Sequence, residues 1–283
     1  MKQMNVYAFA DEACADIDQQ IIAMKRNRLK GLEIRNVDGE SISDISYAKA
    51  REVRQKMERA QLSVWSIGSP IGKIDIEEDD FHAHIETFKR TIEIAHILNC
   101  ENIRLFSFFI PRGKDPAFYK EEVLNRLKQF VEIAKGSGID LCHENEKDIY
   151  GDTAQRCLEI HREIPELKGI FDPANFIQCS QDTLKSWELL HPYIKYLHIK
   201  DALSDGTVVP AGSGIGNLKL IIDRYYAQGG RHVTVEPHLT VFDGLEKLEH
   251  QDMQSNIAAF QYPNPNIAFD TACNALKKLI CEE

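Results

Sequence analysis

The sequence predicts one α/β domain over residues 1–283, folded as a (β/α)8 TIM barrel with an extra C-terminal helix. Short runs rich in β-branched and aromatic residues alternate eight times with longer amphipathic runs, a pattern typical of βαβ units and a parallel sheet. The repeat is about 35 residues long, close to the ~30 expected of one such unit. Eight units of this size match the roughly 250 residues of a typical barrel.

A doubly wound open sheet is the alternative architecture for the same alternation. Its dinucleotide-binding version needs a glycine-rich loop directly after the first strand. In this chain the corresponding turn reads Phe9-Ala-Asp-Glu-Ala13 and contains no glycine. The turn and the count of eight units therefore favour the closed barrel.

The first four units fill the N-terminal half of the chain. Each expected helix repeats its apolar residues three or four positions apart, as Phe81, Ile85, Phe88, Ile92 and Ala95 do in the third. We expect strands at residues 5–9, 31–35, 63–67 and 102–106, and helices at 16–29, 47–60, 80–98 and 118–134.

The last four units repeat this rhythm. A long loop with a glycine-rich stretch at 212–216 follows the seventh strand, in a region that often binds phosphate in barrels. Pro263 and Pro265 interrupt the helical pattern before a final amphipathic helix at about 267–281. We expect strands at 140–144, 169–172, 196–200 and 232–236, and helices at 152–164, 182–190, 218–227 and 245–260.

Composition and charge exclude several classes of protein. The chain has 34 Lys and Arg against 44 Asp and Glu, and this net charge of −10 disfavours binding to nucleic acid or to an anionic membrane surface. Seven cysteines without a C-x-x-C pair indicate reduced thiols rather than a disulfide framework. The sequence shows no signal-peptide core and no apolar run long enough to cross a bilayer, so we expect a soluble, cytoplasmic protein.

Four consecutive predicted strands, the fifth to the eighth, end in residues that can bind a metal. These are Glu144, Asp172, His198 and Glu236, separated by 28, 26 and 38 residues, which is about one unit each time. Ends of neighbouring strands lie about 5 Å apart, so the four side chains can converge on one ion. Three carboxylates and one imidazole suit Mn²⁺ or Mg²⁺, with Co²⁺, Fe²⁺ and Zn²⁺ as alternatives. The competing interpretation is that these residues cap the following helices or pair with local lysines.

The proposed ligand types also suggest a chemistry. Glu144 and Glu236 come from separate strands and can flank a substrate on two sides. A divalent cation polarises a carbonyl or hydroxyl oxygen, which acidifies the neighbouring C–H bond and stabilises an enediolate. Two bases on opposite sides of one carbon permit epimerisation, and proton transfer between adjacent carbons gives aldose–ketose isomerisation.

At these strand ends the chain resembles the xylose isomerase-like TIM-barrel superfamily of sugar phosphate isomerases and epimerases. The motifs are 143–145 (His-Glu-Asn), 172–175 (Asp-Pro-Ala-Asn), 198–201 (His-Ile-Lys-Asp), 212–214 (Gly-Ser-Gly) and 235–237 (Val-Glu-Pro). The resemblance covers essentially the whole barrel. It implies that Glu144, Asp172, His198 and Glu236 bind one divalent cation, Mn²⁺ above all, and that Glu144 and Glu236 also act as the catalytic acid/base pair. It further implies a homodimer or homotetramer.

Departures from the superfamily narrow the expected activity. Tagatose and psicose 3-epimerases carry Glu, His and Arg where this chain has Tyr150, Asn175 and Ser204, which argues against that activity. Endonuclease IV-type DNA-repair barrels add further histidine ligands. The third and fourth strands here end at 66–69 and 106–108 without histidine, so DNA repair is a remote alternative.

Five further residues are candidates for contacts with substrate. Lys200 shares the strand parity of His198 and either contacts substrate or phosphate, or pairs with Asp201 or Asp205. The other four each have a structural alternative: a turn in the loop for Asn175, ion pairs for Arg104 and Glu33, and a role in orienting the site for His238.

Together these observations predict a divalent-metal-dependent isomerase or epimerase acting on a small sugar or sugar phosphate. The alternatives are a metal-dependent lyase or dehydratase that acts on a keto-sugar or inosose, and a barrel that binds sugar without catalysis. We expect a small carbohydrate as the partner, and neither nucleic acid nor membrane.

Overall fold

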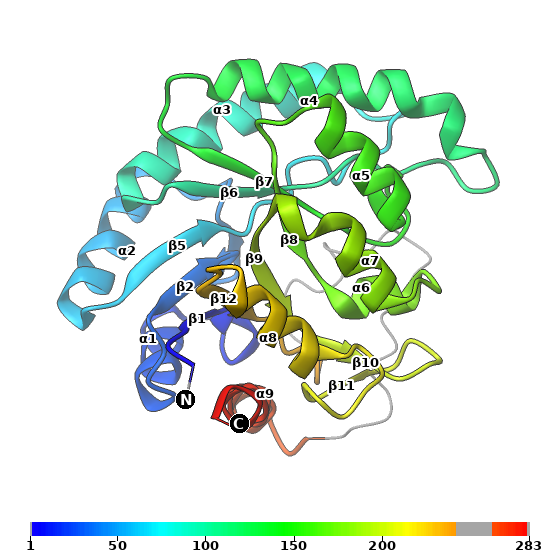
Figure 1. Cartoon of the computed structure of the whole chain (residues 1–283). Helices are drawn as coiled ribbons and strands as arrows, with labels where there is room; N and C mark the ends of the chain where they lie inside the picture. The colour runs from blue at the N-terminus through cyan, green and yellow to red at the C-terminus, as the bar shows by residue number, and fades with distance from the viewer. Residues whose placement is uncertain (1, 242–261, 282–283) are drawn as a thin grey trace.

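The computed structural model describes residues 2–241 and 262–281, and its centre is a closed barrel of eight parallel strands (Figure 1). The strand order around the barrel is β1-β12-β9-β8-β7-β6-β5-β2, and β1 closes it by pairing with both β12 and β2. The predicted fold class is therefore confirmed. The barrel strands are β1 (Asn5–Ala8), β2 (Gly31–Ile34), β5 (Ser63–Ile67), β6 (Asn102–Leu105), β7 (Asp140–Glu144), β8 (Lys168–Phe171), β9 (Ile194–Ile199) and β12 (His232–Val235).

Helices surround the barrel, and most begin at a polar residue that caps the first turn. Asp16, Ser46 and Asp80 each accept a hydrogen bond from a backbone N–H of the turn that follows, which satisfies a group with no partner inside the helix. Several of the predicted ranges count such a cap as part of the helix, so they start one or two residues before the helix in the structure. The helices are α1 (Ile17–Arg26), α2 (Tyr47–Ala60), α3 (Phe81–Leu98), α4 (Lys120–Ala134), α5 (Ala154–Glu163), α7 (Thr183–Leu190), α8 (Leu218–Ala227) and α9 (Pro265–Cys281).

Helix α9 packs on the outside of the barrel between α8 and α1 (Figure 1). Asp270 of α9 pairs with Arg26 at the end of α1 at 2.9 Å, and the backbone N–H of Lys2 donates to the carbonyl of Ile280. This is the place where the helix of an eighth unit belongs in a (β/α)8 barrel. The sequence predicted this helix as an addition to the barrel, and the eighth helix predicted at 245–260 lies outside the described residues.

Three small elements lie in loops where the sequence showed no regular pattern. A short helix, α6 (Pro173–Gln178), begins directly after β8, where we expected a loop around Asn175. It has six residues, too few to show an amphipathic period, and it is started by the cap Asp172 and by Pro173 in the first turn. Two small hairpins, β3 (Asn36–Val37) with β4 (Glu40–Ser41) and β10 (Asp201–Ala202) with β11 (Val208–Val209), follow β2 and β9.

The interior of the barrel has an apolar layer, and a polar layer follows it toward the carboxyl ends of the strands. Cys142, Ile170 and Tyr196 form a buried cluster, against which Trp65 packs. The Tyr196 hydroxyl donates a hydrogen bond of 2.9 Å to Glu33, which begins the polar layer. In the part of the chain that the structure describes, no helix is both long and apolar enough to cross a membrane.

Gly31 is required where β2 and β5 lie close together. A Cβ atom at this position would lie 1.9 Å from the backbone carbonyl oxygen of Ser63, so the strands would have to separate. We expect Gly31→Ala to lower the free energy of unfolding by at least about 3 kcal/mol, the upper end of what overpacking costs. Urea unfolding followed by circular dichroism measures this change.

Gly39 provides the control. It has a positive φ of 80° but no atom within 4 Å of an added Cβ, so Gly39→Ala should cost only the ~1 kcal/mol of a left-handed residue. Equal losses in the two variants would contradict the proposed clash.

Candidate metal centre

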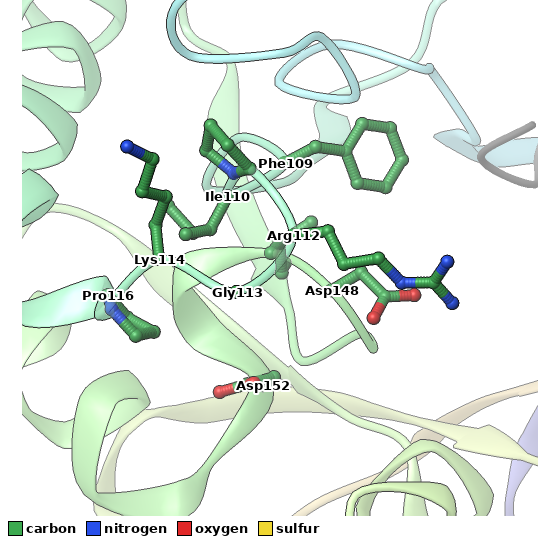
Figure 2. A pocket seen from close by; sticks show the side chains of 10 residues that line it. Phe109, Ile110, Arg112, Gly113, Lys114, Pro116, Asp148 and Asp152 are labelled. Atoms are coloured by element: carbon green, nitrogen blue, oxygen red, sulfur yellow. The ribbon is translucent and has the colours of Figure 1, made fainter.

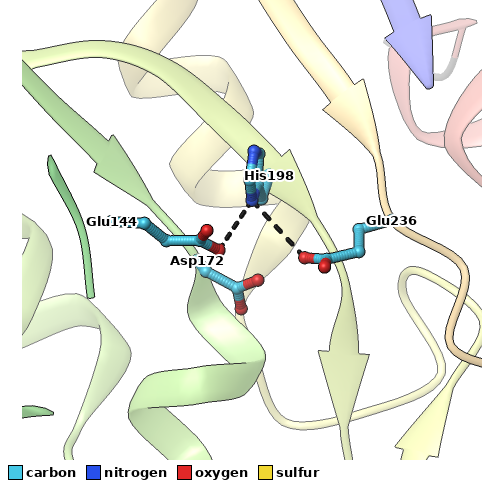
Figure 3. A group of neighbouring side chains, drawn as sticks. All are labelled: Glu144, Asp172, His198 and Glu236. Carbon is cyan, nitrogen blue, oxygen red and sulfur yellow. Dashed lines mark hydrogen bonds and ion pairs between the residues drawn. The ribbon is translucent and has the colours of Figure 1, made fainter. Parts of the chain in front are cut away.

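Glu144, Asp172, His198 and Glu236 meet at the ends of β7, β8, β9 and β12 (Figure 3). All four are buried, and each offers one ligand atom that lies within 4.8 Å of the other three. Figure 3 shows Glu144 and Glu236 on opposite sides of His198, with Asp172 beside them. The structure thus brings together the four residues that the sequence selected as metal ligands, and their role as ligands stays a prediction.

His198 is held between carboxylates on both of its ring nitrogens. Nδ1 lies 2.7 Å from Glu144 Oε1 and 3.4 Å from Glu236 Oε2, while Nε2 lies 3.0 Å from Glu33 Oε2. Burial opposes protonation of the ring, but Glu144 and Glu33 outweigh it and raise the pKa of His198 well above its usual value. In this arrangement Nδ1 faces the proposed ligands, and Glu33 orients the ring from the other side, as carboxylates behind metal-binding histidines do.

Asp172 is fixed by two asparagines and by the helix that it caps. Its backbone N–H donates to Asn145 Oδ1 and its carbonyl accepts from Asn145 Nδ2, both at 2.9 Å. Its Oδ1 accepts the N–H of Asn175, whose side chain donates to the carbonyl of Asn145 at 3.0 Å. The structure therefore places the Asn175 side chain on Asn145, in helix α6 rather than in a loop.

Lys200 and Arg104 bring positive charge to the same cluster. Lys200 Nζ lies 3.1 Å from Asp172 Oδ2 and 3.1 Å from Glu236 Oε2, and Arg104 Nη1 lies 3.1 Å from Glu144 Oε2. The ion pair predicted for Arg104 is confirmed. The predicted partners of Lys200, Asp201 and Asp205, are wrong, because their carboxylates accept backbone N–H groups of the following loop instead.

Side chains alternate along a strand, so residues 33 and 35 are expected on the same, inner face of the second strand. Glu33 does lie in the lumen, but it pairs with His198 and Tyr196 and not with Arg35. Arg35 instead donates to Asp11 at 2.8 Å and to Glu12 at 3.1 Å. Strand parity identified the correct face for both residues. It could not identify which charges from other strands share that face.

His238 lies on the far side of Glu236 from the other ligands. Its Nδ1 is 3.2 Å from Glu12 Oε1 and 3.6 Å from Glu236 Oε1, and its backbone N–H donates to Glu12 Oε2 at 2.6 Å. Arg35 Nη1 is 3.7 Å from the same oxygen of Glu236. Glu236 therefore turns Oε2 toward the proposed centre and Oε1 toward His238 and Arg35.

The residues present fit a divalent cation. Oxygen ligands on opposite sides of such an ion, each at about 2.1 Å, lie about 4.2 Å apart, so the observed spacing needs little adjustment. Asp172 Oδ2 is buried and forms no hydrogen bond, and it points into the cluster, where the ammonium of Lys200 lies 3.1 Å away. Burial, helped by the neighbouring carboxylates of Glu236 and Glu144, raises the pKa of Asp172 to about 8 against the opposing effect of Lys200.

Four charged residues near the centre were missed by the sequence analysis. Asp11 and Glu12 lie three and four residues after the end of β1, and Glu146 lies two residues after Glu144, so closeness to a strand end was a usable signal for all three. Lys73, which pairs with Glu146 at 3.0 Å, lies in the irregular loop after β5, where the sequence offers no signal.

A separate cavity of about 260 Å³ lies between the loops that follow β6 and β7 (Figure 2). Its lining includes Arg112 and Asp148 and none of the four proposed ligands. The proposed chemistry therefore belongs to the buried cluster and not to this cavity.

Comparison with known proteins agrees with this architecture. The sequence model of the xylose isomerase-like TIM barrel matches residues 24–269. The chain belongs to this family. No curated protein sequence matches the chain.

Solved structures share the fold at low sequence identity. The chain is similar to the probable 3-DHS dehydratase AsbF from Bacillus anthracis, with 17% identity, a TM-score of 0.72, and coverage of 97% of this chain and 99% of that one. It is also similar to 3-keto-D-glucoside 4-epimerase YcjR from E. coli, with 14% identity, a TM-score of 0.70, and coverage of 99% and 100%. A third similar structure is the IOLI protein with a bound zinc atom, with 14% identity, a TM-score of 0.76 and 98% coverage of both chains.

Cation binding is expected to release protons. Ligands must be deprotonated, so at neutral pH binding should displace about two protons, one from His198 and one from Asp172. Asp172 loses its proton as the pH rises through about 8, so the number of protons released should fall and the apparent affinity should rise more steeply below that pH than above it. Calorimetric titration with Mn²⁺ or Mg²⁺ in buffers of different ionisation enthalpy measures both quantities. Binding without proton release at neutral pH would contradict this protonation scheme.

Glu33 is expected to tune the affinity through His198. Glu33→Gln removes the charge behind the ring and should weaken cation binding by about 10- to 100-fold, the usual cost of losing such a partner. Glu132→Gln, on the exposed face of α4, is the matched control and should bind normally. Equal affinities in the two variants would show that Glu33 has no influence on the centre.

Proposed function

We propose that this protein is a divalent-metal-dependent isomerase or epimerase of a small sugar or sugar phosphate. The observation that carries the proposal is the buried set of three carboxylates and one imidazole at the carboxyl ends of four adjacent strands. Barrel enzymes place their chemistry at this end. The fold shared with a sugar epimerase and with a zinc-containing barrel supports the same class of reaction.

Glu144, Asp172, His198 through Nδ1, and Glu236 would hold the cation. When bound, it supplies Lewis-acid polarisation of a substrate oxygen and thereby acidifies the adjacent C–H bond. The oxygen-rich ligand set suits Mn²⁺, as the sequence predicted, and it suits Mg²⁺ equally well.

Glu144 and Glu236 would exchange protons with the substrate. They belong to β7 and β12, which β8 and β9 separate, so they approach the centre from two sides. Arg104 holds one oxygen of Glu144, while Lys200 and His198 hold Oε2 of Glu236. Burial alone would raise the pKa of Glu236, but Lys200 and His238 outweigh it and lower the pKa well below its usual value, so this group is ionised. Glu236 therefore carries the charge that a general base needs, and Glu144 faces the centre from the other side, where the second proton transfer of an epimerisation would take place.

The remaining candidates would act on the substrate or on these bases. The ammonium of Lys200 lies between the carboxylates of Asp172 and Glu236. From this position it would donate a hydrogen bond to an oxygen of a substrate bound at the centre. Asn175, Arg104, Glu33 and His238 hold ligand side chains in place. We also propose that the protein forms a homodimer or homotetramer and acts in the cytoplasm.

Exchange of substrate hydrogen with D₂O tests the reaction class. A panel of ketoses and aldoses, incubated with metal-loaded protein in D₂O, should yield an isomer or epimer that carries deuterium at the carbon next to the carbonyl. A product lighter by one water would instead identify the lyase or dehydratase alternative. No exchange in any sugar, with metal bound, would overturn the proposal and favour a sugar-binding barrel.

Substitution of the bases tests the mechanism. Glu144→Gln and Glu236→Gln should each lower kcat by about 10²- to 10⁴-fold, the usual contribution of a general base, while circular dichroism shows an unchanged fold. Glu132→Gln, far from the centre on α4, should keep full activity. Retained turnover in both active-site variants would refute the acid/base assignment.

A further inference from the structure

The loop after β9 contains a glycine pattern that could cradle a phosphate. Gly212, Gly214 and Gly216 alternate along it, and such loops bind anions through their backbone N–H groups. In the structure an internal carboxylate occupies this place. Asp201 Oδ2 accepts the N–H groups of Gly212 at 2.9 Å and Gly214 at 3.0 Å, and Oδ1 accepts that of Gly216 at 2.9 Å.

Two of the glycines lie too close to this carboxylate to carry a side chain, and at Gly214 the backbone oxygen of Ala202 is equally close, at 2.3 Å from an added Cβ. A Cβ atom at Gly214 would lie 2.4 Å from Asp201 Oδ1, and one at Gly216 would lie 2.6 Å from the same oxygen. The N–H of Ala202 also donates to Oδ1 at 2.9 Å, so the carboxylate, which is 1% exposed, accepts four backbone hydrogen bonds. The pattern that suggests phosphate binding in the sequence is thus explained by Asp201 itself.

The cations around the centre also have carboxylate partners of their own. Among the described residues, the buried Arg35, Arg104 and Lys200 each lie within 3.1 Å of an acidic oxygen, and so does Lys73, whose side chain is 7% exposed. The pairs are Arg35 with Asp11, Lys73 with Glu146, Arg104 with Glu144, and Lys200 with Asp172 and Glu236. A phosphate dianion would have to compete with these carboxylates in a site that is already rich in negative charge.

We propose that Asp201 is a specificity-determining residue that fills the phosphate cradle, so that the substrate is an uncharged sugar and not a sugar phosphate. This inference rests on the proposed function for the identity of the reaction. The occupied cradle can nevertheless be tested without any turnover. Asp201 would exclude an anion in two ways: its negative charge repels the anion, and it already accepts the hydrogen bonds of the backbone N–H groups that would bind one.

Paired substrates provide the first test. Metal-loaded protein is given ketoses and the same ketoses esterified with phosphate at the terminal carbon farthest from the carbonyl. The free sugar should be preferred by at least about 100-fold in kcat/KM, because like charges repel in a buried site. Equal or better turnover of the phosphate esters would overturn the assignment. If neither form reacts, the proposed function has failed, and the second test still decides the cradle.

Binding of inorganic phosphate provides the second test. In calorimetric titrations with saturating Mg²⁺, the wild-type protein should not bind phosphate at millimolar concentration, whereas Asp201→Ser should bind it through the vacated N–H groups. Asp205→Ser removes a neighbouring carboxylate, which accepts only local N–H groups of its turn, and should behave as wild type. Phosphate binding by the wild-type protein, or none by a folded Asp201→Ser, would overturn the proposal. If Asp201→Ser does not fold, the wild-type titration and the paired substrates remain decisive.

Discussion

Burying four carboxylates around one imidazole is the constraint on which the rest of the barrel end depends. Glu33, Glu144, Asp172 and Glu236 are each at most 4% exposed, and isolated charges in such surroundings are very costly. Arg104, Lys200 and the protonated ring of His198 offset part of this charge. Asp172 nevertheless keeps a raised pKa. The four carboxylates outnumber these three positive groups, so a divalent cation would supply charge that the cluster can accept.

The apolar end of the lumen makes these interactions strong. Trp65, Cys142, Ile170 and Tyr196 fill the barrel on the side away from the centre, and the Tyr196 hydroxyl reaches up to Glu33. Charged groups interact more strongly in such a low-dielectric interior than in water, and unpaired ones cost more. The same packing that closes the barrel therefore demands that the charges above it be paired.

Around this cluster, each proposed ligand is held by groups from a different loop. Asn145 and Asn175 hold Asp172, while Arg35 and His238 lie beside the outer oxygen of Glu236, and Glu12 in turn pairs with both of them. Such supporting contacts restrict the ligand side chains to one orientation. Asp201 fixes the glycine loop in the same way, by accepting hydrogen bonds from its backbone N–H groups. In our proposal this internal carboxylate also decides which sugars the site accepts, because it occupies the place of a phosphate.

The sequence alone determined the parts of this protein that depend on local periodicity. Strand and helix alternation identified the barrel, and the position of Glu144, Asp172, His198 and Glu236 at strand ends placed them together, because parallel strands all end on one side. Tertiary structure decided what depends on contacts between distant segments. These are the partners of Lys200 and Glu33, the packing of α9 against α1 and α8, and the use of the glycine loop by Asp201. A charged residue selects among all the charges that share its surroundings, and those surroundings exist only once the barrel has closed.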